Sequence, residues 1–476
     1  MIEQELLKKL FKQHFNEEVF DFKALKGDGS DRTVYRLTSQ NHTAIGIYGK
    51  NRKENEAFIS FSKTLSEQKI KVPEIYEIDL DNHIYLEEDL GDELLFTWME
   101  KIKSSESFNT EIVAMYQNVL KVLPTIQIIA GKKINFGLCY QHIEFAHESM
   151  LWDMHYFKWN FLNLFYKDNI DNELLECDFN QLANILMQED RNFFMYRDFQ
   201  SRNIMIKNNE PYFIDYQSGR RGALQYDVAS LLYDAKAKIP QEIREALLDF
   251  YISEVNKIIN VNPEKFKKYF YGFVLIRIMQ ALGAYGFVGI VKNKPHFLNS
   301  IPFAIDNLRI LQKQCSFLSD LPVLNNIIEK ICAIDNWQEI VPENKELTVK
   351  IVSFSFKKNE RPKDETDNGG GFVFDCRGLV NPFWEEKLKN LTGLDSDVKI
   401  FLDSKERVQN FLSHVYELID LTVLSYQTRG YNNLMVSFGC TGGQHRSVYC
   451  AEKLAEHLKN NGVKISVQHL VLKNNL

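Results

Sequence analysis

The chain has 476 residues, 45% of them hydrophobic, and a formal net charge of −7. This composition excludes a disordered chain, and the small negative charge provides no broad basic surface, so we do not expect nucleic acid as a partner. A chain of this length can bury more than one core and should form two or three domains. Its seven cysteines are an odd number without zinc-ligand spacing, which is typical of reduced thiols.

The N-terminal segment, MIEQELLKKLFKQHF, is amphipathic and charged, and it lacks the apolar core and small-residue cleavage site of a secretory signal. The most apolar long stretch, residues 271–291, is interrupted by Arg277 and Gln280. Such an interruption favours a buried helix over a membrane span. We therefore expect a cytoplasmic protein without a membrane partner.

Two strand-like runs surround a small turn in ALKGDGSDRTVYRL, residues 24–37. Backbone N–H groups in such a turn can cover nucleotide phosphates, so Gly27, Gly29 and Ser30 are candidate cofactor-binding residues. The alternative is an ordinary hairpin turn, which favours the same residue types. The position of the turn ahead of the catalytic segment described below favours the cofactor interpretation.

The next strand-like run, TAIGIYG at residues 43–49, has no lysine of the kind that pairs nucleotide phosphates in protein kinases. Arg32 and Lys50 are the candidates to replace that lysine, and Arg32 is taken as a cofactor-binding residue. Glu56, on the following predicted helix, is the candidate to orient whichever cation serves.

The segment HIYLEEDLGDELL, residues 83–95, begins as a strand and then becomes polar. A connector between two kinase lobes has this pattern, and its backbone groups bind the adenine ring. Glu87 and Leu90 are therefore candidate cofactor-binding residues, although a plain strand end has the same pattern.

An aromatic stripe follows in SMLWDMHYFKWNF, residues 149–161. Trp152, His155 and Trp159 share one helical face because they are three and four residues apart. Such a stripe is more often part of a core than a sugar platform, so we expect these side chains to be core.

The segment YRDFQSRNIMIKNNEPYFIDYQ, residues 196–217, contains strand-like runs at 204–207 and 212–214 with two asparagines between them. This pattern predicts a hairpin. The hairpin would bring Asp215 beside Asn203. A carboxylate and an amide oxygen at one point suit Mg²⁺, with nucleotide phosphates completing its coordination.

Asp198 precedes Asn203 at the Asp-x-x-x-x-Asn spacing of a kinase catalytic loop, in which the aspartate accepts the proton of the attacking hydroxyl. Tyr196 occupies the place of the usual histidine. Asp and Asn also occur in turns for purely structural reasons. The three matched spacings favour catalysis, with Asp198 as the base and Asn203 and Asp215 as metal ligands.

These segments together resemble the aminoglycoside phosphotransferase superfamily, and residues 10–335 are similar to its cell-wall amino-sugar kinases of the AmgK type. The resemblance rests on KGDGSDRTVYRL, IYLEEDLGD, YRDFQSRNIM, FIDYQSGRRGALQYDVASLLYDA and QALGAYGFVG. It implies a two-lobed α+β protein-kinase-like fold that uses ATP and Mg²⁺ to phosphorylate the anomeric hydroxyl of N-acetylmuramate or N-acetylglucosamine. Gln217 and Arg220 are the candidate substrate-binding residues, with Arg220 either favouring an acidic sugar or lying in solvent.

The pattern changes near WQEIVPENKELTVK, from long helical periodicity to a polar connector and then a strand. We place an N-lobe at 1–90, a C-lobe at 91–338, a linker at 339–347 and a small α/β domain at 348–476. In the last domain, LMVSFGCTGGQHRSVYC predicts a strand ending at Phe438, a glycine-rich loop, and a helix from about Ser447. Such a helix start, with a nearby arginine, suits an anion.

The spacing from Cys440 to Arg446 also matches the phosphate loop of protein tyrosine phosphatases, whose cysteine attacks phosphorus. Gly439 replaces the usual histidine before the cysteine, and no general-acid loop is recognisable. With FDCRGLVNPFW and LTGLDSDV, the loop instead resembles the C-terminal domain of RapZ over residues 348–474. That resemblance implies a pocket for a sugar phosphate or phosphate, lined by Arg377, Asn381, Cys440, Thr441, Gly442, Gly443, His445 and Arg446.

We therefore expect an ATP-dependent sugar kinase with an attached sugar-phosphate-binding module, of a type used in peptidoglycan recycling. Two alternatives remain open at this point. One is a regulatory adaptor of RapZ type with a degenerate kinase domain. The other is a kinase for an aminoglycoside, choline or homoserine fused to a cysteine-dependent phosphatase-like domain. The oligomeric state does not follow from the sequence.

Overall fold

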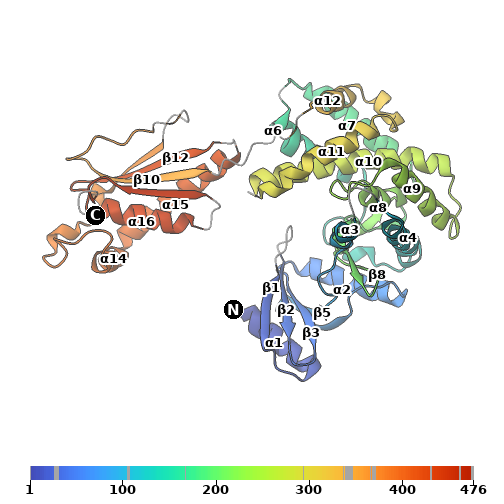
Figure 1. The fold of residues 1–476 in the computed structure, drawn as a ribbon, viewed down its shortest axis with the longest axis horizontal. Coiled ribbons are helices and arrows are strands. Elements are labelled where there is room, and N and C mark those ends of the chain that lie inside the picture. The colour runs from blue at the N-terminus through green and yellow to red at the C-terminus, as the bar shows by residue number, and fades with distance from the viewer. Residues whose placement is uncertain are drawn as a thin grey trace. The chain divides into compact units, whose positions relative to one another are not determined.

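The computed structural model divides into two compact units, residues 1–284 with 300–335 and residues 285–299 with 336–476 (Figure 1). The predicted turn residues Gly27, Gly29 and Ser30 lie outside the described residues, as does the predicted linker except for Leu347. The structure describes residues 2–25, 32–103, 108–166, 168–292, 294–335, 337, 347–364, 366, 371–428, 431–459 and 463–472.

The first unit begins with a five-stranded antiparallel sheet in the order β1-β2-β3-β5-β4. Apolar residues on one face of this sheet pack against Leu7, Leu10 and Phe11 of the first helix, as the amphipathic N-terminal sequence requires. The elements are α1 (Ile2–Phe15), β1 (Asp21–Leu25), β2 (Thr33–Thr38), β3 (Thr43–Tyr48), α2 (Arg52–Glu67), β4 (Ile75–Asp79) and β5 (Ile84–Glu88).

A helical lobe follows, and its long apolar sequences form buried helices around two short two-stranded antiparallel sheets, β6-β9 and β7-β8. Its helices are α3 (Leu95–Ile102), α4 (Thr110–Pro124), α5 (His147–Phe157), α6 (Asn163–Phe165), α7 (Asn172–Leu186), α8 (Leu224–Leu232), α9 (Gln241–Asn256), α10 (Pro263–Gly286), α11 (Ile301–Leu311) and α12 (Pro322–Cys332). Its strands are β6 (Phe193–Met195), β7 (Ile204–Lys207), β8 (Glu210–Phe213) and β9 (Arg220–Gly222).

Two helical stretches of this lobe, Thr110–Ala130 and Pro263–Val291, are long and apolar enough to cross a membrane by composition alone. In each, 56% of the most apolar window is buried inside the protein. Core helices pass the same test of composition, so the burial favours the buried helix expected for residues 271–291.

The second unit contains a four-stranded, fully parallel sheet in the order β11-β12-β10-β13. Parallel strands need crossover connections, and helices supply them here. The strands are β10 (Thr348–Ser355), β11 (Gly371–Asp375), β12 (Asn433–Cys440) and β13 (Lys464–His469), and the helices are α14 (Ser396–Asp403), α15 (Glu406–Thr428) and α16 (Arg446–Leu458).

Candidate functional site

The predicted catalytic hairpin is present, formed by β7 and β8 with a turn at Asn208 and Asn209, both of which have positive φ. The second strand begins two residues earlier than predicted. Asn203 Nδ2 lies 3.2 Å from Asp215 Oδ2 and donates to the backbone oxygen of Asp198 at 2.8 Å. The hairpin therefore brings the predicted base and both predicted metal ligands together.

Besides the two turn asparagines, two further residues of this segment have left-handed backbone conformations, Arg197 with φ 81° and Asp215 with φ 67°. Such conformations cost free energy in residues other than glycine and concentrate at functional sites. Arg197 is held by ion-pair contacts to Asp153 at 2.7 and 2.8 Å and by the Tyr226 hydroxyl at 2.6 Å. The Arg197 contacts stabilise the backbone on which Asp198 is mounted.

Asp227, on α8, stabilises the backbone just before Asp198. Its carboxylate accepts hydrogen bonds from the backbone N–H groups of Tyr196 and Arg197 at 2.9 and 3.0 Å, and from Gln127 Nε2 at 2.9 Å. Burial raises the pKa of Asp227 to about 7, although these three donors favour the ionised form and limit the rise.

Arg32 lies at the metal-ligand pair although it is 183 residues away in sequence. Its Nη2 lies 2.8 Å from Asp215 Oδ1 and its Nε lies 3.5 Å from a Glu54 oxygen on α2. The predicted partner, Glu56, instead binds Arg52 at 2.9 Å, and Lys50 is exposed. The expectation for Glu56 is therefore wrong by half a helical turn, because residue 54 and not residue 56 faces the site.

Gln217 also lies beside Asp215, with its Nε2 2.8 Å from Asp215 Oδ1. Its Oε1 is buried and has no hydrogen-bond partner among the described residues. This oxygen therefore lies next to the metal-ligand pair with no hydrogen-bond partner among the described residues. Gln217 does not line the cavity described below, where a substrate-binding residue is expected.

The donor set at this point fits Mg²⁺, since it combines a carboxylate, an amide and an unmet amide oxygen. Within the described ranges no group of three His, Cys, Asp or Glu side chains could hold a metal by itself. Mg²⁺ in phosphoryl-transfer sites commonly takes one or two carboxylates and completes its shell with phosphates and water.

The predicted lobe connector follows β5. Leu90 is buried, and Glu87 carries a carboxyl whose Oε2 is buried without a hydrogen-bond partner in the described part of the chain. Burial raises the pKa of Glu87 to about 8, and the nearby Arg32 opposes that shift. Its neighbour Glu88 is paired with Lys207 at 2.6 Å.

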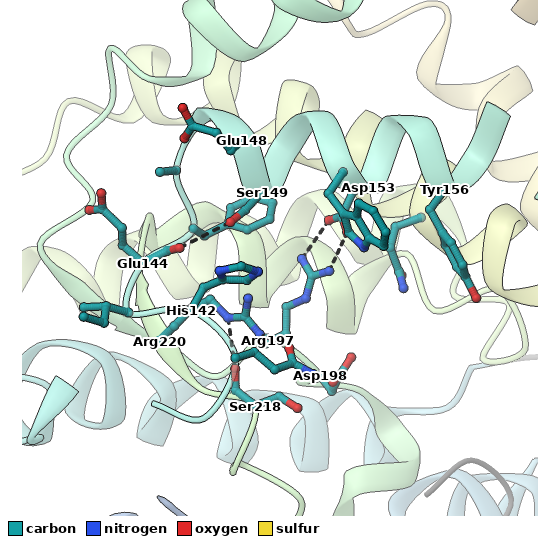
Figure 2. Close-up of a pocket in the computed structure, with 16 residues that line it drawn as sticks. His142, Glu144, Glu148, Ser149, Asp153, Tyr156, Arg197, Asp198, Ser218 and Arg220 are labelled. Carbon is teal, nitrogen blue, oxygen red and sulfur yellow. Dashed lines mark hydrogen bonds and ion pairs between the residues drawn. The ribbon is translucent and has the colours of Figure 1, made fainter. Parts of the chain in front are cut away.

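A cavity of about 1020 Å³ opens beside Asp198 (Figure 2). Figure 2 shows Arg197 between Asp153 on α5 and Asp198, with Ser218 and Arg220 on the opposite wall. The lining residues are Gln141, His142, Ile143, Glu144, Phe145, Ala146, Glu148, Ser149, Trp152, Asp153, Tyr156, Arg197, Asp198, Ser218, Arg220 and Gln280.

Arg220 is the buried cation of this cavity, with only 4% of its surface exposed. It donates to the Ser218 carbonyl at 3.1 Å and to the Gln141 side-chain oxygen at 2.6 Å, and it has no carboxylate ion pair among the described side chains. Burial lowers its pKa, and the neighbouring Arg197 lowers it further. The solvent-exposed alternative for Arg220 is therefore wrong.

Trp152 lines the cavity and is 60% exposed, and Trp159 beside it is 48% exposed. Their ring centroids lie 5.8 Å apart, and the Trp159 ring stacks on His155, which Glu176 holds at 2.6 Å. The expectation that this stripe is core is wrong for both tryptophans.

In the second unit, β12 ends at Cys440 and α16 begins at Arg446, so both elements extend slightly beyond the predicted ends. Cys440 is buried, and its Sγ lies 3.2 Å from both the Gly443 backbone nitrogen and the Ser447 hydroxyl. Gly443 has φ +71°, and an added Cβ would meet Val471 at 2.4 Å. Only glycine fits this turn without strain.

Arg446 is 95% buried and does not extend freely over the loop. Its Nη1 donates to the backbone oxygens of Arg377 and Leu379 at 2.9 and 3.0 Å, and its Nε is buried with no partner in the described chain. The guanidinium therefore fixes the segment after β11 against the start of α16 and retains one unmet donor.

The remaining residues of the predicted second pocket are more dispersed. Arg377 is exposed and paired with Asp375 at 2.6 Å, and the Asn381 side chain caps its own short turn. His445 is buried and contacts the Leu388 oxygen at 3.1 Å, and burial lowers its pKa. In the loop itself Gly442 and Gln444 are exposed, and Thr441 is half-buried.

Comparisons with known proteins divide the chain in the same way. Residues 21–259, half of the chain, match the model of the phosphotransferase enzyme family, and residues 347–473 match that of the RapZ C-terminal domain. A nucleotide-binding protein of Shewanella halifaxensis is 41% identical over 142 residues, 29% of this chain and 48% of that protein. An RNase adapter protein RapZ of Erwinia tasmaniensis is 33% identical over 176 residues, 37% of this chain and 60% of that protein.

The chain thus spans about half the length of the curated relatives it matches. Among solved structures, choline kinase LicA of Streptococcus pneumoniae is 15% identical with a TM-score of 0.43, covering 64% of this chain and 100% of that chain. A choline kinase of Cryptosporidium parvum is 16% identical with a TM-score of 0.46, covering 69% and 99%.

Proposed function

Because the chain belongs to the phosphotransferase enzyme family, we propose that its first unit transfers a phosphoryl group from ATP to a hydroxyl of an amino sugar. The observation that carries this proposal is the position of Asp198. Its side chain lines the 1020 Å³ cavity, while its backbone oxygen is bonded to Asn203 of the metal-ligand pair. An acceptor in the cavity and a phosphate at the pair would meet at this residue.

Asp198 accepts the proton of the attacking hydroxyl, which makes that oxygen more nucleophilic as it approaches phosphorus. Arg197, through its bidentate contact with Asp153, keeps the base in position. Asn203 and Asp215 would hold Mg²⁺, and Arg32 is placed to bind nucleotide phosphates. The metal, when bound, neutralises charge on the transferred phosphate.

Arg220 supports an acidic sugar as acceptor, because it is a buried guanidinium without a carboxylate ion pair in the described chain and would bind the carboxylate of such a sugar. The cavity lining also contains Glu144 and Glu148, which suit a cationic acceptor, so the Arg220 argument bears on acidic sugars alone. The exposed Trp152 ring offers an apolar face of the kind that packs against the C–H face of a sugar. N-acetylmuramate or N-acetylglucosamine, phosphorylated at the anomeric hydroxyl in cell-wall recycling, is the acceptor we propose.

For the second unit we propose binding of a sugar phosphate or phosphate at the loop between β12 and α16. The α16 N-terminus supplies a positive dipole end, and Arg446 supplies an unmet donor. The burial of Cys440 favours this role over the phosphatase alternative, because a nucleophile has to reach the phosphorus atom.

The test is a screen of the purified chain with ATP and Mg²⁺ against N-acetylmuramate, N-acetylglucosamine, an aminoglycoside, choline and homoserine, with the phosphate located by NMR. We expect an amino sugar 1-phosphate. Arg220→Met should raise KM for an acidic sugar more than for a neutral one. Arg221→Met is the matched control, because Arg221 packs over Phe136 and does not line the cavity. Phosphorylation of choline or the antibiotic in preference to the sugars would overturn the proposal.

A further inference from the structure

The two faces of β5 have different neighbours. Ile84 and Leu86 belong to the core cluster beneath α1. Side chains alternate along a strand, so Tyr85 and Glu87 face the other side. The Tyr85 hydroxyl accepts from Arg32 Nη1 at 3.4 Å, and Arg32 Nη2 binds Asp215. Glu87 therefore lies on the sheet face that leads to the metal-ligand pair.

The Glu87 carboxyl has an unmet hydrogen-bonding atom on this face. The residue as a whole is half-buried, but its Oε2 has no solvent contact and no partner among the described residues. A buried polar atom of this kind requires an explanation, and a ligand that is absent from the structure is one. The adjacent Glu88 does have an ordinary partner, because it forms an ion pair with Lys207.

Burial favours the protonated form of this carboxyl, and the neighbouring cation opposes it. Arg32 is the cation, Tyr85 and Tyr216 are buried phenols whose own pKa values are raised by burial, and Glu54 shares Arg32 with Asp215. Burial raises the pKa of Glu87 to about 8. At neutral pH the group is thus mainly a carboxylic acid, with one O–H donor and one C=O acceptor.

We propose that the Glu87 side chain recognises the purine base, accepting from the 6-amino group of adenine with its C=O and donating its O–H to N7. Adenine offers this donor and acceptor pair side by side, whereas guanine offers acceptors at both positions. Glu87 would then select adenine over guanine nucleotides. The inference rests on the proposed function, since it assumes that a nucleotide binds between β5 and Asp215.

The experiment is calorimetric binding of ADP, GDP and 7-deaza-ADP to the full chain at pH 7. The variants are Glu87→Gln, which keeps one donor and one acceptor, Glu87→Met, which has neither, and the matched control Glu88→Gln. We expect the parent, Glu87→Gln and Glu88→Gln to prefer ADP over GDP by roughly 5- to 150-fold. Glu87→Met should lose most of that preference, and 7-deaza-ADP should bind the parent more weakly than ADP.

The pH dependence gives a second readout. As pH rises from 7 to 9 the acid ionises and loses its O–H donor, so ADP affinity of the parent should fall, while Glu87→Gln should lack this component. Unchanged ADP preference in Glu87→Met, or equal pH profiles for the parent and Glu87→Gln, would overturn the inference. Failure of the parent to bind any purine nucleotide would instead overturn the proposed kinase function and the inference with it. Thermal unfolding of each variant establishes that it is folded.

Discussion

The catalytic hairpin of the first unit and the Cys440–Arg446 loop of the second are both proposed to handle phosphate, but they are built with opposite charge. The hairpin gathers Asp198, Asn203 and Asp215, whose oxygens suit a cation that then holds the phosphate. The loop presents a helix N-terminus directly.

The difference lies in what each site does with its arginine. Arg32, immediately before β2, forms an ion pair with Asp215 at 2.8 Å, so its charge lies at the site itself. Arg446 donates two hydrogen bonds to the backbone carbonyls of Arg377 and Leu379, so its main role is to hold that segment in place. A shared ligand type and a matching residue spacing therefore do not imply the same chemistry.

The largest expected effect is in the hairpin. Asp198→Asn removes the proton acceptor but keeps the shape, and it should lower kcat about 10²- to 10⁴-fold. Asp215→Ala should be at least as severe, because it removes a metal ligand together with the ion pair to Arg32. Steady-state phosphorylation of the best acceptor, with ATP binding measured in parallel, checks both. Near-normal turnover by Asp198→Asn would remove the proposed base.

Asp227→Asn tests the brace beneath the hairpin. The two carboxylate oxygens of Asp227 accept hydrogen bonds from the backbone N–H groups of Tyr196 and Arg197, one oxygen for each. An asparagine has only one accepting oxygen, so one of these N–H groups loses its acceptor. We expect a loss of about 1–3 kcal/mol in the free energy of unfolding. The pKa of Asp227 is about 7 in the folded protein, which is above its value of about 4 in the unfolded chain. Its contribution to the free energy of unfolding therefore falls as pH rises from about 4 to 7. The variant lacks this dependence.

Denaturant unfolding at several pH values from 5 to 8 measures this effect. The stability gap between the parent and Asp227→Asn should narrow as pH rises toward 7. A gap that stays constant over the range would mean that Asp227 is ionised throughout.

Arg446→Ala sharpens the comparison in the second unit. It leaves the carbonyl oxygens of Arg377 and Leu379 without their donor, and we expect destabilisation of roughly 1–3 kcal/mol. Binding of glucosamine 6-phosphate should weaken by about 1.5–3 kcal/mol. Arg446→Lys separates the two effects, because it keeps the charge but not the paired contact. Calorimetry and denaturant unfolding on each variant are the measurements, and unchanged ligand affinity in Arg446→Ala would place the anion site elsewhere.

Cys440→Ser should have the smallest effect. The loop backbone and Arg446 remain, and a serine hydroxyl can accept from Gly443, so affinity for glucosamine 6-phosphate should stay within about threefold, under 1 kcal/mol. Neither protein should hydrolyse an aryl phosphate. Hydrolysis by the parent that disappears in Cys440→Ser would make the second unit a phosphatase.

The sequence by itself determined the local parts of this protein. Residues within about twenty positions of one another, such as Asp198, Asn203 and Asp215, are joined by one short hairpin whose turn and strand signals are local, so their meeting was predictable. The glycine-rich loop between a strand and a helix was predictable for the same reason, and the matched family models agree with both segments.

Tertiary structure decided which distant charges meet. Arg32 binds Asp215 across 183 positions, Arg446 binds carbonyls more than sixty positions away, and Trp152 lines a cavity instead of a core. Local propensity and spacing carry no information about such pairs, because packing of separate elements sets the distance between them. The sequence therefore identified the chemistry that each segment can perform, and the fold decided which side chains are placed to perform it.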